Sequence, residues 1–425
     1  MKIIIAILLL SAIVLFHELG HFLLAKANHI GVTEFSLGMG PRLFSFERGG
    51  TRYSLKLLPF GGSCAMLGED LDDTQPGAFS AAPVWGRIAT VAAGPVFNFI
   101  LAFVLATLIV GLYGSGPSRV SMVAEDSAAM KAGLQEGDLI TSFQGHKVDL
   151  TEELYLYLYL NPLSEEQVSL KVRRDGQTVD IVYEPDVNIR YLMGYYKDEE
   201  NAALVSSVIP GMGMEDAGIK AGDLITAING TAVTGDTLDA YLSENPLSEE
   251  PVTITYERDG LSYEVSVTPG EDRIPILGFS TVWNEKQSGL SIFKYGFLEL
   301  KYTVKSTILG LKELFTGKLS VKEMSGPVGV VNVVGETYEN SKSEGAFVVL
   351  LNMMNLVVLL SANLGVMNLL PIPGLDGGRL IFLLIEAIRR KPGNRELEGM
   401  INVAGVMLLL GFMVFILYND IAKLF

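Results

Sequence analysis

The stretch Ile13–Ala25, IVLFHELGHFLLA, places two histidines and a glutamate inside an otherwise apolar run. Nearly every neighbour is leucine, isoleucine, valine, phenylalanine or alanine. A titratable side chain in such surroundings must be paired in a soluble core, and it costs still more inside a bilayer. The sequence therefore indicates that His17, Glu18 and His21 have a function that offsets this cost.

Four segments of the chain are long and apolar enough to cross a membrane, which takes about 20 residues. Of the 425 residues, 49% are hydrophobic. The predicted spans are Ile3–Ala25, Ile88–Tyr113, Ala346–Leu370 and Met400–Tyr418. No cleavage site of the signal-peptide kind follows the first segment, so we interpret it as a span and not as a leader.

Basic residues determine the predicted topology. They gather in the loop between the first two spans and in the loop between the last two. The positive-inside rule places both loops in the cytoplasm, so both chain ends and the long segment between spans two and three lie outside. We therefore expect a multi-pass protein of the cell (inner) membrane, with the lipid bilayer as its surroundings.

The segment between the second and third spans is acidic and internally repeated. Residues 115–288 include 12 basic and 30 acidic residues, which argues against nucleic acid or anionic lipid as a partner. Lys131–Val148 is echoed by Asp216–Val233, and Asn161–Pro185 by Asn245–Pro269. Each copy predicts a short helix, a strand after AG[LI]xxGD and a hairpin turned at an Asp-Gly pair. We expect two similar small α+β domains outside the membrane.

The repeated AGxxxGDxI core resembles the PDZ domain in its circularly permuted bacterial form. PDZ domains bind extended peptides by adding a strand to a sheet edge. A pair of such domains could equally act as a steric plug, because a fold does not fix a function. Both interpretations stay open from the sequence.

The histidines of the first span have the spacing of a zinc site. His17 and His21 are four residues apart, so on a helix they share one face about one turn apart. H-E-x-x-H supplies two imidazole ligands for Zn2+ and, at Glu18, a carboxylate that takes a proton from the zinc-bound water and passes it to the leaving amine. Paired histidines on a helix are often only hydrogen-bonded polar groups, but inside a membrane span that explanation is weaker. The motif predicts a zinc hydrolase with Glu18 as general base.

A catalytic zinc needs a third protein ligand, and the candidate is Asp376 in NLGVMNLLPIPGLDGGRL, Asn363–Leu380. The prolines and the glycine before it free backbone groups at membrane depth, which is tolerated only inside protein or beside a wet cavity. Asp376 is also suited to cap the helix that follows through Glu386, and the two roles are compatible. Two histidines and one carboxylate would leave one coordination position open, as catalytic sites do.

Six stretches in order along nearly the whole chain carry a family resemblance. They are HELGH (17–21), FSLGMGPRLFSF (35–46), LKLLPFGG (55–62), AAGPVFNF (92–99), SGPVG (325–329) and NLLPIPGLDGGR (368–379). The chain resembles the site-2 protease family of intramembrane zinc metalloproteases, in particular its bacterial regulator-of-sigma-E protease type. The resemblance implies His17, His21 and Asp376 as zinc ligands. It also implies Glu18 as the base and Asn368 as a contact to substrate or transition state.

The resemblance also implies a substrate and a way to hold it. The implied substrate is a single-span membrane protein already shortened on its outer side, such as an anti-sigma factor, cut within the membrane towards the cytoplasmic side. A transmembrane helix must be unwound before hydrolysis, because its peptide bonds lie in its own hydrogen bonds. In the family the region of Thr51–Gly62, TRYSLKLLPFGG, forms a membrane-associated β-hairpin whose edge could pair with the unwound chain. A surface hairpin of no catalytic importance is the alternative.

The expected fold is a polytopic α-helical membrane protein with a β-hairpin and two inserted extracytoplasmic PDZ-like α+β domains. The predicted divisions are a protease core at 1–114, PDZ-like domains at 115–190 and 191–272, a linker with an amphipathic segment at 273–345, and the last two spans at 346–425. Remnant signal peptides and pheromone precursors are alternative substrates. A non-catalytic PDZ scaffold is disfavoured by the intact third-ligand motif, and a metal transporter predicts more ligands along a pathway.

Overall fold

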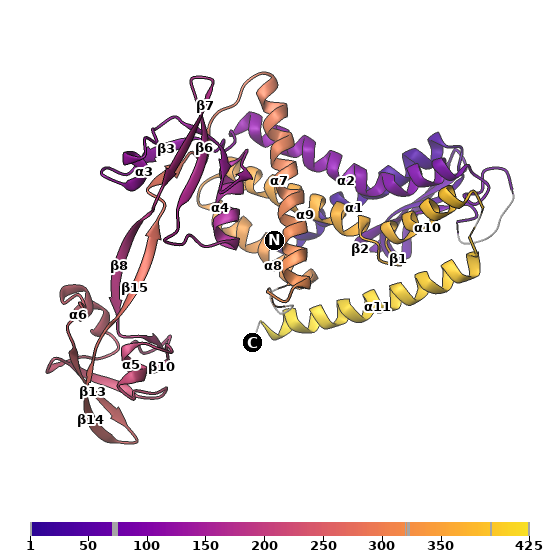
Figure 1. Ribbon diagram of the computed structural model, residues 1–425. Helices are drawn as coiled ribbons and strands as arrows, with labels where there is room; N and C mark the ends of the chain where they lie inside the picture. The colour runs from indigo at the N-terminus through magenta and orange to yellow at the C-terminus, as the bar shows by residue number, and fades with distance from the viewer. Residues whose placement is uncertain (1, 70–74, 319, 321–323, 392, 424–425) are drawn as a thin grey trace. The chain divides into compact units, whose positions relative to one another are not determined.

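The computed structural model describes residues 2–69, 75–318, 320, 324–391 and 393–423. The chain divides into two compact units, shown as a ribbon in Figure 1. Unit 1 comprises Met1–Pro117 and Trp283–Phe425, and unit 2 comprises Ser118–Val282.

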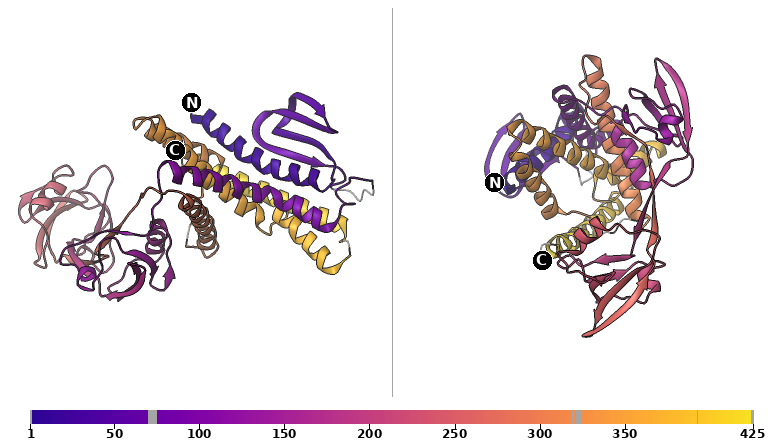
Figure 2. Two further views of the ribbon diagram at one scale, coloured as in Figure 1. Left: turned by 90° about the horizontal axis from the view of Figure 1, so that it is seen from above. Right: turned by 90° about the vertical axis from the view of Figure 1, so that its left-hand side faces the viewer.

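Unit 1 is built on long apolar helices. Four helices of the described chain are long and apolar enough to span a membrane, which confirms the predicted number of spans. They are α1 (Lys2–Ala27), α2 (Val84–Leu112), α9 (Ala346–Leu369) and α11 (Arg395–Ala422). Small side chains allow close packing of these helices, because Ala102 of α2 and Ala362 of α9 are fully buried in one shared cluster. Figures 1 and 2 show α1, α2 and α9 side by side.

Strands β1 (Val32–Arg48) and β2 (Thr51–Met66) form an antiparallel sheet that packs on α1 (Figure 2). Each strand is bent and pairs twice. The first half of β1 pairs with residues 62–66 on one side and with residues 52–55 on the other. Residues 51–56 pair with the second half of β1, so residues 52–55 are paired on both sides. Glycines with positive φ, Gly38 and Gly40 in β1 and Gly61 in β2, permit the bends. Residues 62–66, named here the edge segment, pair with β1 on one side, and no other described strand pairs with them.

The described residues of unit 1 also form α7 (Leu290–Phe315), α8 (Pro327–Lys342) and α10 (Asp376–Arg389). The predicted cap of α10 is wrong. Asp376 is the first residue of the helix, and Leu375 occupies the cap position without a side-chain hydrogen bond. The loop before α10 packs on its first turn, because a Cβ on Gly377 would lie 2.1 Å from the Leu370 carbonyl oxygen. The side chain of Asp376 is thus left for another role.

Unit 2 consists of two similar halves, as the internal repeat predicts. Each half has a four-stranded antiparallel sheet and its own buried cluster. The first sheet has the order β5-β4-β6-β7, formed by β4 (Leu139–Phe143), β5 (His146–Lys147), β6 (Val168–Arg174) and β7 (Gln177–Tyr183), with α3 (Ala128–Lys131) and α4 (Thr151–Leu160). The second has the order β12-β11-β13-β14, formed by β11 (Leu224–Ile228), β12 (Thr231–Ala232), β13 (Val252–Arg258) and β14 (Leu261–Val267), with α5 (Gly213–Asp216) and α6 (Leu238–Glu244). Both hairpin turns have positive φ at their Asp and Gly, as type I′ turns require.

The chain leaves the first half and later returns to it. The short strands β9 (Tyr195–Lys197) and β10 (Val205–Val208) belong to the second half. Strand β8 (Asp186–Leu192) pairs with β15 (Gly270–Ile276), and β16 (Phe279–Thr281) pairs with β3 (Val120–Val123) of the first half. Unit 2 therefore ends at Val282, beyond the boundary at residue 272 that the sequence suggested.

Candidate metal centre

Helix α1 presents His17 and His21 on one face, as their spacing predicts. Both side chains are buried, and their Nε2 atoms lie 3.2 Å apart. The polar pair is accommodated because α2 packs directly against this face of α1. A Cβ on Gly20 would lie 2.3 Å from the Ala93 carbonyl oxygen, so glycine permits the contact.

Asp376 joins the two histidines from the far end of the sequence. Its Oδ2 atom lies 3.2 Å from Nε2 of His17 and 3.4 Å from Nε2 of His21. Ligand bonds of about 2.0–2.1 Å in a tetrahedral zinc site put neighbouring ligand atoms about 3.3 Å apart. The three separations therefore match those of a tetrahedral zinc site.

The carboxylate of Asp376 is directed at the two imidazoles. Its Oδ2 atom is buried, and its nearest partners among the described residues are the two Nε2 atoms, which are themselves candidate metal ligands. Among the described residues, His17, His21 and Asp376 form the cluster with the donor set of a metal site. Imidazole and carboxylate ligands suit zinc, and three protein ligands leave one position open for water.

Helix α2 supplies the other wall of the centre. A Cβ on Gly94 would lie 2.3 Å from Nε2 of His21, so only glycine lets α2 approach the histidines. The Thr90 carbonyl oxygen accepts a hydrogen bond of 2.9 Å from Nδ1 of His21. The amide of Asn98 lies 3.1 Å from Nδ1 of His17. Sequence analysis did not identify these α2 residues as part of the site, although the Gly-Pro pair at Gly94 inside an apolar helix was a signal.

Glu18 faces a cavity of about 350 Å³ that the three candidate ligands also line. The edge segment forms another wall of this cavity, and it brings Cys64 to the same cavity as the Glu18 carboxylate. The sequence predicts a substrate-holding edge within residues 51–62, and the structure corrects this for residues 52–55, which pair on both sides. Among the described residues, the strand edge that lines the cavity with Glu18 is residues 62–66.

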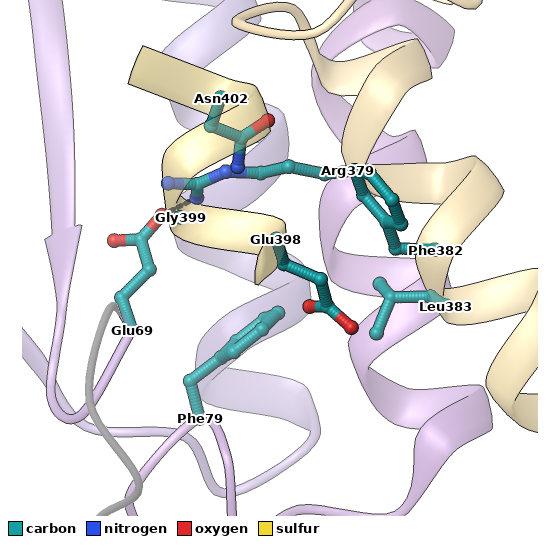
Figure 3. Close-up of a pocket in the computed structure, with 8 residues that line it drawn as sticks. All are labelled: Glu69, Phe79, Arg379, Phe382, Leu383, Glu398, Gly399 and Asn402. Carbon is teal, nitrogen blue, oxygen red and sulfur yellow. Dashed lines mark hydrogen bonds and ion pairs between the residues drawn. The ribbon is translucent and has the colours of Figure 1, made fainter. Parts of the chain in front are cut away.

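A second, smaller cavity of about 80 Å³ adjoins the first (Figure 3). The two cavities share Glu69 and Arg379, which form an ion pair. Figure 3 shows Arg379 reaching from α10 towards Glu69, with Glu398 and Asn402 of α11 on another side. The described residues that line this cavity include no histidine or cysteine, so the candidate metal ligands belong to the larger cavity.

Asn368 lies half-buried in the last turn of α9, eight residues before Asp376. The structure does not place it among the described residues that line the larger cavity. Its contact with substrate therefore stays a prediction.

Comparison with known proteins gives one family. Residues 5–412 match the model of peptidase family M50. The chain is 31% identical to "Zinc metalloprotease RasP" of Geobacillus kaustophilus, over 99% of this chain and 97% of that protein. It is 30% identical to "Regulator of sigma-W protease RasP" of Bacillus subtilis, over 99% of this chain and 98% of that protein.

Proposed function

Since this chain belongs to peptidase family M50 and is a site-2-type zinc metalloprotease of the membrane, we propose that His17, His21 and Asp376 bind its zinc. Glu18 is the general base of the reaction in this proposal. The observation that supports it best is the separation of 3.2–3.4 Å among the three ligand atoms, together with the buried Oδ2 of Asp376.

The zinc ligands and Glu18 have separate roles in the proposed reaction. Zinc, when bound, supplies Lewis acidity that lowers the pKa of a coordinated water towards neutrality. Glu18 takes the proton of the attacking water and passes it to the leaving amine of the cleaved peptide bond.

The edge segment is the proposed site for the substrate backbone. An unwound stretch of a transmembrane helix has free N–H and C=O groups, which are costly in lipid. Pairing with residues 62–66 as an added strand would satisfy those groups and hold the peptide bond beside Glu18 and the ligands. Asn368 is proposed to contact the substrate or the transition state as the peptide bond enters.

The proposed substrates are single-span membrane proteins already shortened on their outer side, with an anti-sigma factor as the leading class. The name of the Bacillus subtilis relative, a regulator of sigma-W, supports this choice. Remnant signal peptides or pheromone precursors would undergo the same chemistry. We place the cleavage within the membrane towards the cytoplasmic side, and the two halves of unit 2, as PDZ-like domains, outside the cell membrane.

Replacing Glu18 by glutamine tests the assignment. Glu18→Gln should retain zinc, because Glu18 is not a ligand, and should lose cleavage of a membrane-embedded reporter substrate. Removal of a general base typically lowers the rate by about 10²–10⁴-fold. Glu136→Gln, an exposed change in unit 2, is the matched control and should retain both zinc and cleavage. Wild-type cleavage by zinc-loaded Glu18→Gln would remove Glu18 from the role of base.

A further inference from the structure

The two histidines of the metal centre meet different partners on α2. Nδ1 of His21 lies 2.9 Å from the Thr90 carbonyl oxygen. A carbonyl oxygen can only accept, so the His21 proton is on Nδ1 and the lone pair of Nε2 is available to a metal. The backbone of α2 thus fixes the ligating tautomer of His21.

Nδ1 of His17 meets the side-chain amide of Asn98 instead. The Nδ2 atom of Asn98 lies 3.1 Å away, and Asn98 is 0% exposed. In this orientation the amide donates to Nδ1, which would leave the single proton of a neutral His17 on Nε2. Nε2 is the atom that faces Asp376, and a protonated Nε2 has no lone pair for zinc.

The oxygen of the same amide is the acceptor that His17 needs if its Nε2 is to bind zinc. Oδ1 of Asn98 is buried and has no hydrogen-bond partner among the described residues. A half-turn of the amide exchanges Oδ1 and Nδ2 with almost no change of shape. The oxygen would then accept a hydrogen bond from Nδ1–H of His17 and leave the lone pair of Nε2 directed at the ligand cluster.

We propose that Asn98 is a positioning residue that holds His17, through Oδ1, in the tautomer that binds zinc by Nε2. The inference rests on the proposed function, since it takes His17 as a zinc ligand. Zinc-bound histidines generally donate their second N–H to an oxygen acceptor, and losing that acceptor costs about 10–100-fold in metal affinity.

Two helices hold Asn98 in place for this role. Its backbone carbonyl oxygen accepts a hydrogen bond of 2.9 Å from Oγ of Ser361 in α9, and both residues are 0% exposed. The position of Asn98 is therefore set by packing, while the orientation of its amide is set by its hydrogen bonds. These two contributions can be separated by mutation.

The test measures zinc affinity of the full-length protein by competition with a chelator. Asn98→Leu removes the acceptor at similar volume and should weaken zinc binding by about 10–100-fold. Asn98→Asp retains an oxygen that can only accept, so it should retain zinc affinity and the visible spectrum of the Co2+-substituted protein. Ser361→Ala is the matched control, because it loosens Asn98 without removing the acceptor, and it should leave affinity unchanged.

The Asn98→Asp variant decides the question even if Asn98→Leu fails to fold. Loss of zinc by Asn98→Asp would mean that the amide must donate to His17, which overturns the inference. An equal loss in Ser361→Ala would assign the effect to helix packing and overturn it as well. A wild-type protein that binds no zinc would instead overturn the proposed function.

Discussion

At the scale of single residues, the metal centre depends on the absence of a side chain at Gly94. A methyl group there would lie 2.3 Å from Nε2 of His21 and 2.7 Å from Cε1 of His17. Both histidines lie on one rigid helix, so they cannot move aside without leaving the position that faces Asp376. The helix α2 would have to shift away from α1 instead.

We predict that Gly94→Ala lowers zinc affinity by about tenfold or more, since even the loss of a residue that hydrogen-bonds to a zinc ligand costs about 10–100-fold. Chelator competition on the purified protein measures this. Gly111→Ala in the same helix is the control, because its nearest contact would be an ordinary 3.6 Å to Ile292. Full zinc affinity in Gly94→Ala would show that α1 and α2 are less closely fixed than the structure indicates.

At the scale of elements, one ion pair recurs in both halves of unit 2. Arg174 of β6 binds Asp138 before β4, and Arg258 of β13 binds Asp223 before β11. Each aspartate also accepts a backbone hydrogen bond from the preceding turn, at Gln135 and Lys220. Burial is the largest single effect on the pKa of Asp223 and opposes its ionisation. The hydrogen bonds from Arg258 and from the backbone N–H of Lys220, together with the positive charges of both residues, outweigh burial, so the pKa of Asp223 is lowered.

Asp223→Asn should reduce the free energy of unfolding of the second half by about 2 kcal/mol at pH 7. A carboxyl group with a lowered folded-state pKa stabilises the fold above its unfolded pKa of about 3.9 and loses that effect as the pH falls through the folded value. The difference between variant and wild type should therefore vanish in that acidic range. Hydrogen exchange of the β11 and β13 amides, compared between variant and wild type at each pH, measures this difference in the free energy of unfolding.

The exposed pair Arg190–Asp272 supplies the control for this prediction. Its side chains are 56% and 32% exposed, so Asp272→Asn should change stability by less than about 1 kcal/mol. Equal effects of the two substitutions, or an Asp223 effect that persists in acid, would contradict the argument.

The limits of prediction from sequence are clearest at this scale. His17, Glu18 and His21 lie within five residues of one helix, and the LDG sequence at residues 375–377 marks Asp376. Local patterns were therefore sufficient to identify the candidate ligands and the base. The edge segment could not be identified, because glycine bends allow β1 and β2 to pair twice, and pairing between segments leaves no local pattern. The strand β16 returns to β3 over a long separation for the same reason. Asn98 is proposed to act by its contact with His17, 81 residues away in the sequence, and a single sequence does not reveal such a contact.

At the scale of the whole molecule, the insertion of unit 2 between two spans suggests how substrates are selected. Ser115 and Glu285 flank the insertion and exchange backbone hydrogen bonds of 2.8 and 3.1 Å. The membrane unit therefore closes the junction by itself, and unit 2 can be removed with a short linker. A steric plug should restrain cleavage of substrates with bulky outer domains, whereas a peptide-capturing module should assist cleavage.

We predict that deleting residues 118–282 lets the enzyme cleave an untrimmed substrate at a rate close to that of the trimmed one. The candidate ligands, Glu18 and the edge segment all lie in unit 1, so the chemistry does not require unit 2. One membrane assay compares intact and trimmed substrates, with and without the deletion. Zinc content of the deleted protein is the folding control. Continued rejection of the intact substrate by the zinc-loaded deletion variant would contradict the plug.

The metal centre is the claim on which the others depend, and X-ray absorption at the zinc edge tests it most directly. Cys64 lines the same cavity, so a sulfur ligand is the realistic alternative to Asp376. The account predicts one zinc per chain with nitrogen and oxygen neighbours at about 2.0–2.1 Å, and the loss of this shell in Asp376→Ala. A sulfur neighbour at about 2.3 Å, or an unchanged shell in Asp376→Ala, would contradict it.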